Sequence, residues 1–267
     1  PHKGEGVCPV THLPARPHAG RDGGMTDAEL ARHLAHAAGQ MLLQLQGDGP
    51  ADGKALGAEG DRLSNAWLME QLRRERPDDA ILSEEEAPDL ARLAHRRVWL
   101  VDPLDGTREY GERRQDWAVH VALSIDGRIA DGAVAQPALN QCVCTQAPPA
   151  LLPEAAPLRI LVSRSRQAAC AEALATAIGA VLVPMGSAGA KTLAVLRGEA
   201  DVYLHQGDMH EWDSGAPAAV AQAAGLWVSR VDGSSLVFNQ PRPLTPDILI
   251  CHKARAPALL AAIAAVL

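Results

Sequence analysis

The sequence predicts a layered α/β protein, in which helices pack against β-sheets. Segments with the apolar spacing of helices alternate along the chain with short apolar runs typical of strands. Between two of these runs, Asp126-Gly127 is a strong signal for a hairpin turn. With 267 residues, the chain can bury a sizeable core as one domain or as two closely joined lobes.

The N-terminal region combines an irregular segment with two predicted helices. Residues 1–24 are rich in Pro, Gly and His and lack a hydrophobic period, so we expect a disordered extension. A capping-box pattern that begins at Thr26 predicts a helix from about Asp27 to Gln46. A second helix is predicted from about Leu63 to Glu75, after a glycine-rich loop or hairpin over residues 47–60.

Short apolar runs in the first half of the chain predict strands. Cys142 and Cys144 alternate along one of them, where ordinary packing is a better interpretation than metal binding. The other runs are Ala80–Leu82, Val98–Val101, Trp117–Ser124 and Ile129–Gln136.

The stretch from Gln146 to Pro157 contains four prolines and is the predicted boundary between two lobes, residues 25–150 and 151–267. Beyond it, strands and helices alternate again. The predicted strands are Leu158–Ser163, Val181–Pro184, Asp201–His205 and Asp247–Cys251, and the predicted helices are Gln167–Ile178, Ala190–Arg197, Ser214–Ala224 and a final C-terminal helix.

Composition narrows the class of protein. Hydrophobic residues make up 47% of the chain but aromatic residues only 3%, so the core must rely on Ala, Leu and Val. The formal charge of −7 disfavours a nucleic-acid duplex as partner. We expect no membrane span, because no apolar stretch reaches about 18 residues. We also expect no signal peptide, because the N-terminus lacks a continuous apolar core behind basic residues. Five cysteines, an odd number, favour the reducing cytoplasm over a disulfide framework.

Two carboxylates, Asp102 and Asp105, end one of the predicted strands. Because Pro103 fixes the local turn, both carboxylates and the Leu104 carbonyl can converge on a hard cation such as Mg²⁺. Asp-Pro and Asp-Gly pairs are also common turn formers, so this motif alone is explained equally well as a structural turn.

Neighbouring residues and two further acidic motifs favour the metal site. Gly106 and Thr107 offer backbone N–H groups that suit a phosphate oxygen. Ser83-Glu84-Glu85-Glu86 follows another predicted strand, and Glu211-Trp212-Asp213-Ser214 precedes an alanine-rich helix. Separately, these two motifs would be a solvated charge run and a helix N-cap. Three acidic motifs at element ends are harder to explain by structure alone.

In order and spacing, Ser83-Glu84-Glu85, Asp102-Pro103-Leu104-Asp105-Gly106-Thr107 and Trp212-Asp213 resemble the inositol monophosphatase superfamily of metal-dependent, lithium-sensitive phosphatases, over about residues 26 to 267. Further segments resemble its 3′(2′),5′-bisphosphate nucleotidase branch, called CysQ in bacteria, and are most similar to actinobacterial members. These segments are Arg108-Glu109-Tyr110, Asp116-Trp117-Ala118-Val119-His120, Ser163-Arg164-Ser165-Arg166 and Gly186-Ser187 with Lys191.

The resemblance implies a five-layered αβαβα sandwich with two or three Mg²⁺ ions between the lobes. One ion would be held by Glu84, Asp102 and the Leu104 carbonyl, and a second by Asp102, Asp105 and Asp213. Thr107 would orient the attacking water, and Asp61 would accept a hydrogen bond from Thr107. Glu84, Thr107 and Asp61 would thus be the catalytic residues. The implied substrate contacts are Leu104, Asp105, Gly106, Thr107, Ser163, Arg166, Gly186, Ser187, Lys191 and Asp213.

The loop from Gly186 to Thr192 is similar to a nucleotide-binding P-loop but lacks its spacing, because Ala190 separates Gly189 from Lys191. One interpretation is a turn whose N–H groups and lysine face a second phosphate or the ribose. The other is a packing turn with a solvated lysine.

The function implied by the resemblance is a Mg²⁺-dependent phosphatase in sulfate assimilation. It would convert adenosine 3′,5′-bisphosphate to AMP and phosphate, and would also act on the sulfated relative of that substrate. An inositol-1-phosphate or fructose-1,6-bisphosphate phosphatase with the same metal site is the alternative. A non-catalytic nucleotide or metal sensor would have lost a ligand, and the motifs have lost none. A homodimer is the family's habit.

Overall fold

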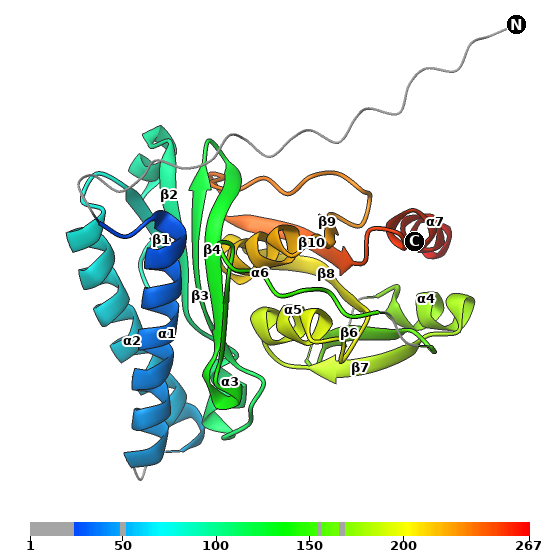
Figure 1. Cartoon of the computed structure of the whole chain (residues 1–267), viewed down its shortest axis with the longest axis horizontal. Helices are drawn as coiled ribbons and strands as arrows, with labels where there is room; N and C mark the ends of the chain where they lie inside the picture. Colours follow the sequence, from blue (N-terminus) through cyan, green and yellow to red (C-terminus); the bar gives the residue numbers. More distant parts are fainter. Residues whose placement is uncertain (1–23, 49–51, 154–155, 166–168) are drawn as a thin grey trace, which may run out of the picture.

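The computed structural model describes residues 24–48, 52–153, 156–165 and 169–267. The disordered extension predicted for residues 1–24 therefore lies outside the described residues, except for Gly24. Within the described ranges the chain forms two five-stranded sheets and the helices that cover them (Figure 1).

The first sheet follows the chain in strand order, β1-β2-β3-β4-β5. The first two strands are parallel, and every later pair is antiparallel. The turn between β3 and β4 is the predicted hairpin, in which Asp126 and Gly127 have φ angles of 51° and 76°. The strands are β1 (Ala80–Ser83), β2 (Arg97–Asp105), β3 (Ala118–Ile125), β4 (Arg128–Gln136) and β5 (Gln141–Cys144).

The second sheet has the order β7-β6-β8-β10-β9, with β6 parallel to both β7 and β8 and with β10 antiparallel to both β8 and β9. The short strand β9 was not predicted from the sequence, and β8 extends beyond its predicted end at His205. The strands are β6 (Arg159–Ser163), β7 (Val181–Met185), β8 (Val202–His210), β9 (Trp227–Ser229) and β10 (Leu244–Cys251).

Helices form three layers around these sheets, and the expected five-layered αβαβα sandwich is confirmed (Figure 1). Helices α1 (Asp27–Asp48) and α2 (Gly53–Glu75) cover the first sheet, and α5 (Ala188–Leu196) and α6 (Glu211–Ala223) lie between the sheets. Helices α4 (Ala171–Ile178) and α7 (Ala256–Val266) cover the second sheet. Three short helices, η2 (Leu90–Ala94), α3 (Thr107–Gly111) and η3 (Pro137–Leu139), lie in the connections.

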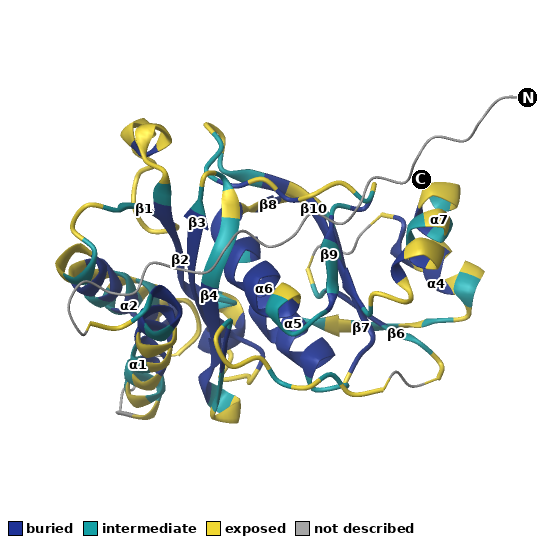
Figure 2. Ribbon diagram, turned by 45° about the horizontal axis from the view of Figure 1, so that its top comes forward, coloured by how far each residue is buried: buried dark blue, intermediate teal, exposed yellow. Residues whose placement is uncertain are grey.

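The middle layer explains why the core is rich in alanine. Every residue of α5 is buried, and so are ten of the residues of α6, because sheets cover both helices (Figure 2). At Gly215 of α6 an added Cβ would lie 2.9 Å from Leu100 Cδ1, so small side chains set how closely α6 approaches the first sheet.

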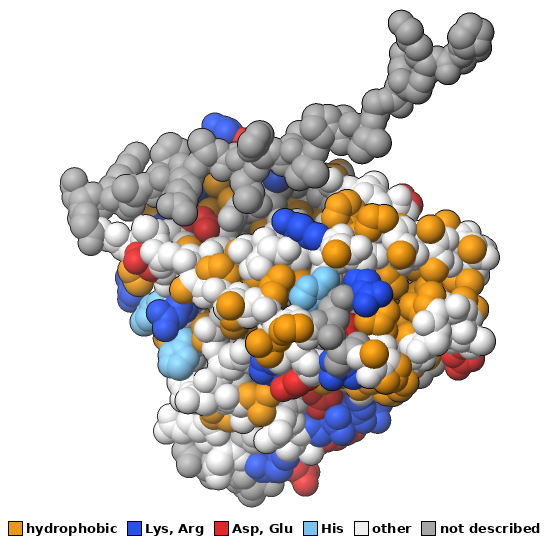
Figure 3. Space-filling model, turned by 45° about the vertical axis from the view of Figure 1, so that its right-hand side comes forward, with side chains coloured by type: hydrophobic (Ala, Val, Ile, Leu, Met, Phe, Trp, Pro, Cys, Tyr) orange, Lys and Arg blue, Asp and Glu red, His pale blue; other side chains and the backbone are white. Residues whose placement is uncertain are grey.

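Helix α7, in an outer layer, is buried on one face and exposed on the other. The exposed positions of α7 are alanines and one proline, so this face appears largely hydrophobic in Figure 3 although its side chains are small.

At the other end of the sandwich, the predicted capping box begins α1. Thr26 Oγ1 accepts from the Glu29 N–H at 3.2 Å, and a Glu29 carboxylate oxygen accepts from the Thr26 N–H at 2.9 Å.

The predicted loop or hairpin over residues 47–60 is wrong, because α2 begins at Gly53. Glycine disfavours helix in isolation, but here it permits close packing. An added Cβ at Gly57 would lie 2.7 Å from Thr107 Cγ2, and one at Gly60 would lie 3.0 Å from Leu104 Cδ2. Tertiary contact therefore outweighs local propensity and brings Asp61, on the same helix, beside Thr107.

Smaller corrections concern helix starts. α4 begins at Ala171, later than the predicted Gln167, which lies outside the described residues. α5 begins at Ala188 and α6 at Glu211, both earlier than predicted, so Asp213 lies inside the first turn of α6. The division into two lobes near residue 150 stays a prediction, although this segment does connect the two sheets. Among the described residues, no helix is long and apolar enough to cross a membrane.

Candidate metal and phosphate site

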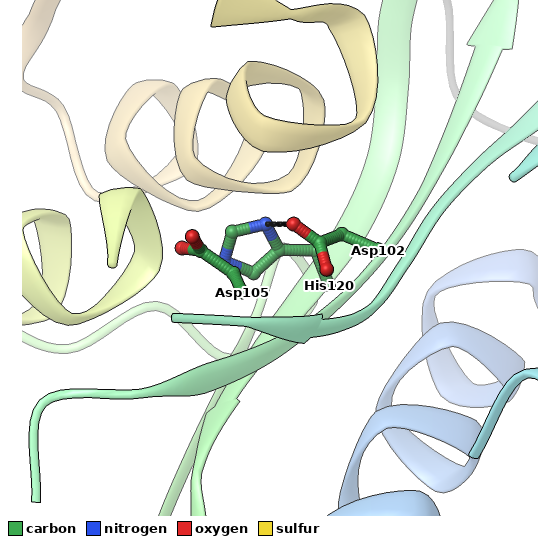
Figure 4. Close-up of side chains that lie close together, drawn as sticks. All are labelled: Asp102, Asp105 and His120. Atoms are coloured by element: carbon green, nitrogen blue, oxygen red, sulfur yellow. Dashed lines mark ion pairs between the residues drawn. The ribbon is translucent and has the colours of Figure 1, made fainter. Parts of the chain in front are cut away.

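Two acidic side chains, Asp102 and Asp105, lie near the carboxyl end of β2, on the side of the first sheet that faces α5 and α6. Asp102, Asp105 and the β3 residue His120 point toward one another, and one ligand atom from each lies within 4.8 Å of the others (Figure 4). Such a group could hold a metal ion. It lies where the first sheet meets the middle layer of helices.

Pro103 makes this geometry by interrupting the strand. The pairing between β2 and β3 is irregular between Asp102 and Asp105, because proline has no N–H to donate. The Leu104 N–H donates to Asp102 Oδ1 at 3.0 Å, and the Pro103 carbonyl accepts from the Ser64 hydroxyl at 2.8 Å. The turn is thus fixed from both sides, as the Asp-Pro motif predicts.

Asp105 is anchored by the start of α5, far away in the sequence. Its Oδ2 accepts from the Ser187 hydroxyl at 2.5 Å and from the Gly189 N–H at 3.0 Å, and lies 3.2 Å from His120 Nε2. Burial raises the pKa of Asp105, but the charges of His120 and Lys191 and the Ser187 hydrogen bond outweigh burial and lower it to about 2. Because all three contacts use Oδ2, Oδ1 can bind a cation without losing them.

His120 lies at the centre of this arrangement, although the sequence analysis gave it no role. It is fully buried, and its Nδ1 lies 3.2 Å from the Trp212 carbonyl, which can only accept, so Nδ1 carries a hydrogen. Its Nε2 faces Asp105. These contacts indicate that His120 positions Asp105 and α6. Strand register was the available signal, since His120 pairs with Asp102 across β2 and β3.

Asp213 comes from the first turn of α6, where its Oδ2 accepts from the His210 N–H at 3.1 Å. Burial and the charges of Asp105 and Glu84 raise the pKa of Asp213 to about 7. The pKa of Glu84, at the end of β1, is also raised to about 7, by burial and by the charges of Asp61, Asp105 and Glu85. Burial and the charges of Glu84, Asp105 and Asp213 raise the pKa of Asp102 well above its usual range.

Four carboxylates, which we name the carboxylate cluster, therefore act on one another's pKa: Glu84, Asp102, Asp105 and Asp213. Like charges gathered in a partly buried site are unfavourable unless a cation neutralises them. Carboxylate and carbonyl oxygens are the donors that hard divalent cations prefer, so the residues present fit such an ion.

Thr107 lies beside this cluster at the start of α3. Its hydroxyl Oγ1 is 3.4 Å from Asp61 Oδ1 and 3.2 Å from the Leu104 carbonyl oxygen, so the contact expected between Thr107 and Asp61 is present. Burial and the charge of Glu85 raise the pKa of Asp61 to about 7. Gly106 precedes Thr107 with a φ of 90°, a left-handed conformation that glycine adopts without strain.

A cavity of about 160 Å³ opens next to Asp105 and Asp213. It brings together most of the predicted substrate contacts, but Leu104 and Thr107 do not line it and Arg166 lies outside the described residues. The lining residues predicted from the sequence are Asp105, Gly106, Ser163, Gly186, Ser187, Lys191 and Asp213, and the others are Glu109, Arg164, Ser165, Ala188, Tyr203, His205 and Met209.

Lys191 is buried at 4% exposure, so the interpretation as a solvated lysine is wrong. Its Nζ donates to the carbonyls of Met185, Gly186 and Ser187 at 3.4, 3.1 and 2.8 Å and lies 5.1 Å from the centre of the Tyr203 ring. Burial lowers the pKa of Lys191 to about 8. These contacts fix the backbone of residues 185–187. Contact between Lys191 and a second phosphate stays a prediction.

Arg164 is the cation that the sequence analysis missed, because it singled out Ser163 and Arg166 from the same motif. Its Nη1 donates to Glu109 Oε1 at 2.6 Å, and both Nη atoms lie 3.4 Å from Glu112 Oε2. The two carboxylates fix the guanidinium at the wall of the cavity. Sequence position could not distinguish Arg164 from Arg166.

Comparison with known proteins shows the family of this chain. The profile of the inositol monophosphatase family matches residues 27–266. The chain is 46% identical over 256 residues to the 3′-phosphoadenosine 5′-phosphate phosphatase of Mycobacterium leprae, covering 90% of this chain and 94% of that protein. It is 31% identical over 225 residues to the 3′(2′),5′-bisphosphate nucleotidase CysQ of Escherichia coli K12, covering 77% and 91%.

The fold is also similar to solved structures. The crystal structure of CysQ from Bacteroides thetaiotaomicron superposes with a TM-score of 0.70 at 24% identity, covering 85% of this chain and 97% of that one. An inositol monophosphatase from Anabaena superposes with a TM-score of 0.71 at 22% identity, covering 90% and 96%. These likenesses concern the fold.

The raised pKa values predict how pH affects the metal-free protein. Because the pKa of Asp213 is about 7 in the folded chain and near 4 when unfolded, its ionisation lowers stability as pH rises from about 4 to about 7. In EDTA, Asp213→Asn should therefore gain unfolding free energy relative to the native protein across this range and hold that gain above it. Urea denaturation at pH 4.5, 6, 7 and 8 measures the difference.

The control is Asp208→Asn, which removes an exposed carboxylate from β8. Its difference from the native protein should change little with pH. A difference for Asp213→Asn that is equally flat would contradict the repulsion described for the carboxylate cluster.

Proposed function

The chain belongs to the inositol monophosphatase family, and from that premise we propose that it hydrolyses the 3′-phosphate of adenosine 3′,5′-bisphosphate to give AMP and phosphate. The observation that carries the proposal is a cavity lined by two carboxylates of the cluster, Asp105 and Asp213, and by the Arg164 guanidinium. The names of relatives that are 46% and 31% identical support the nucleotide as substrate. The same site would accept the 5′-phosphosulfate relative of the substrate.

The proposed metal is Mg²⁺, held at two positions. Glu84, Asp102 and the Leu104 carbonyl would bind one ion, and Asp102, Asp105 and Asp213 the other, with Asp102 shared. When bound, the ions make a water more acidic and neutralise charge on the phosphate and on the leaving oxygen. The donor set of carboxylates and one carbonyl supports Mg²⁺ over softer metals.

The protein's own part is to orient the attacking water and to receive its proton. Because the Thr107 hydroxyl lies against both the Asp61 carboxylate and the Leu104 carbonyl, its hydrogen is directed to one of them. An oxygen lone pair of Thr107 is then available to accept a hydrogen from the water. With a pKa of about 7, Asp61 can take up a proton near neutral pH.

The reaction is an in-line displacement at phosphorus. The water oxygen forms the new P–O bond, the bond to the 3′-oxygen breaks, and that oxygen leaves as the hydroxyl of AMP after it gains a proton. The N–H groups of Gly106 and Thr107 would hold the transferred phosphate. No covalent intermediate with the protein is required.

Arg164 is the group we assign to the second, 5′-phosphate. A guanidinium can donate two parallel hydrogen bonds to phosphate, and the carboxylates of Glu109 and Glu112 already fix its orientation. Lys191 would add positive potential from behind the 185–187 loop, because its hydrogens are used by that loop's carbonyls.

The proposed substrate is tested by phosphate release from adenosine 3′,5′-bisphosphate, inositol-1-phosphate and fructose-1,6-bisphosphate at equal concentration, with Mg²⁺ and with EDTA. We expect the highest kcat/KM for the nucleotide and no release in EDTA. Preference for a sugar phosphate would keep the metal site but overturn the substrate. Absence of release from all three would favour a non-catalytic protein.

Thr107→Ala should lower turnover by about 10²-fold or more, because the attacking water loses its orienting partner. Metal affinity should change little, since the Leu104 carbonyl and the carboxylates remain. Thr107→Ser is the matched control and should keep most of the activity. Equal turnover of Thr107→Ala and the native protein would exclude the proposed role of the hydroxyl.

Arg164→Gln should raise KM for adenosine 3′,5′-bisphosphate by about tenfold, the loss expected for one charged hydrogen-bonding partner. KM for 3′-AMP, which lacks the second phosphate, should change much less. Arg108→Gln is the control, because it removes an equal charge that also contacts Glu112 but does not line the cavity. If both KM values rise equally, Arg164 does not read the second phosphate.

A further inference from the structure

We propose that Arg92 and Glu211 are positioning residues. They would hold Glu84, at the end of β1, and Asp213, on α6, at the spacing that metal binding needs. The side chains of Arg92 and Glu211 bind the same two-residue segment, Asn239-Gln240, which we name the register loop. This inference rests on the metal site in the proposed function. It assigns a role to two buried charges that the proposed reaction does not use.

Glu211 binds the register loop from the side of α6. It is the first residue of that helix, two positions before Asp213, and it is fully buried. Its Oε2 accepts from the Asn239 N–H at 2.6 Å and its Oε1 from the Gln240 N–H at 2.8 Å. One carboxylate thus holds two successive backbone groups and fixes where α6 begins.

Arg92 binds the register loop from the side of β1. It belongs to η2, which follows the Glu84-bearing end of β1 by a short connection, and it is 2% exposed. Its Nη1 donates to the Asn239 side-chain oxygen and its Nη2 to the Gln240 carbonyl, both at 2.7 Å. The Asn239 side-chain nitrogen returns a bond to the Arg92 carbonyl at 3.3 Å.

The register loop lies in a long connection between β9 and β10. The segment between β9 and β10 runs from the second sheet across the top of the molecule to the first sheet before it returns (Figure 1). Phe238 N–H donates to the Gly127 carbonyl at 3.0 Å, so the segment is also tied to the β3–β4 hairpin. Asn239 has a left-handed φ of 58°, which asparagine tolerates better than most residues.

Burying a guanidinium and a carboxylate is unfavourable unless their hydrogen bonds are made. The Glu211 carboxylate and both Nη atoms of Arg92 make theirs to the register loop, whereas the buried Arg92 Nε has no partner among the described residues. The arrangement links the chain that follows Glu84 to the helix that presents Asp213.

The link through the register loop opposes electrostatic repulsion within the carboxylate cluster. Glu84 follows β1 of the first sheet, whereas Asp213 lies in the first turn of α6, so two like charges from different elements face the same site. Without a cation they tend to separate. The register loop opposes that separation from outside the cluster, so the metal ligands stay close enough to bind the same ions.

The experiment compares Glu211→Gln, Arg92→Met and Asn239→Gly with the native chain. Asn239→Gly keeps the left-handed backbone and its N–H but removes the side chain that Arg92 binds, so it tests the link even if a buried-charge variant fails to fold. Arg96→Met is the matched control, because Arg96 is an exposed arginine whose side chain pairs, among the described residues, with Asp126 on the hairpin surface. Mg²⁺ affinity is measured by calorimetry, and stability by thermal melting in EDTA.

We expect the dissociation constant for Mg²⁺ to rise by about tenfold or more in each of the three variants, as for other residues that support metal ligands indirectly. The Mg²⁺ concentration for half-maximal phosphate release should rise in parallel, while kcat at saturating Mg²⁺ changes less than about threefold. Arg96→Met should leave the dissociation constant unchanged.

The opposite results separate this inference from the proposed function. Variants that melt earlier in EDTA but bind Mg²⁺ as tightly as the native chain would show that Arg92 and Glu211 only stabilise the fold. A uniform loss of kcat at saturating Mg²⁺ without a change in affinity would also overturn the inference. If the native chain itself shows no Mg²⁺ binding, the proposed metal site fails instead.

Discussion

Repulsion among clustered carboxylates is the constraint on which the rest of this structure depends. Four acidic side chains, from the end of β1, from β2 and from α6, raise one another's pKa, except where Asp105 has stronger partners. Groups outside the cluster bind Asp102, Asp105 and Asp213. These groups belong to different layers of the sandwich. The site is therefore a property of the assembled fold.

The middle helical layer makes that assembly possible. α5 supplies the Ser187 hydroxyl and the Gly189 N–H to Asp105, and α6 carries Asp213. Both helices must approach the first sheet closely, which explains their small residues: an added Cβ at Gly189 would lie 2.2 Å from His120 Nε2. Alanine and glycine here are requirements of the site as much as of packing.

Electrostatics and function are linked by the same repulsion. A cluster that is unfavourable when empty gains most from a divalent cation, so the free energy that destabilises the metal-free fold becomes affinity for the metal. The cations Arg164 and Lys191 line the same cavity, where they are held by carboxylates and carbonyls. The cavity thus combines cations with metal-binding carboxylates, which suits a substrate with two phosphates.

The sequence by itself determined most of the helices and strands, the Asp126-Gly127 hairpin and the three acidic motifs, because these depend on local spacing and turn chemistry. It could not place the start of α2, because contact between Gly57 and Thr107 outweighs the loop preference of glycine. His120 and Arg164 were recognised only when strand pairing and side-chain contacts located them. Tertiary structure decided these points, because each depends on residues that are distant in the chain and adjacent only after folding.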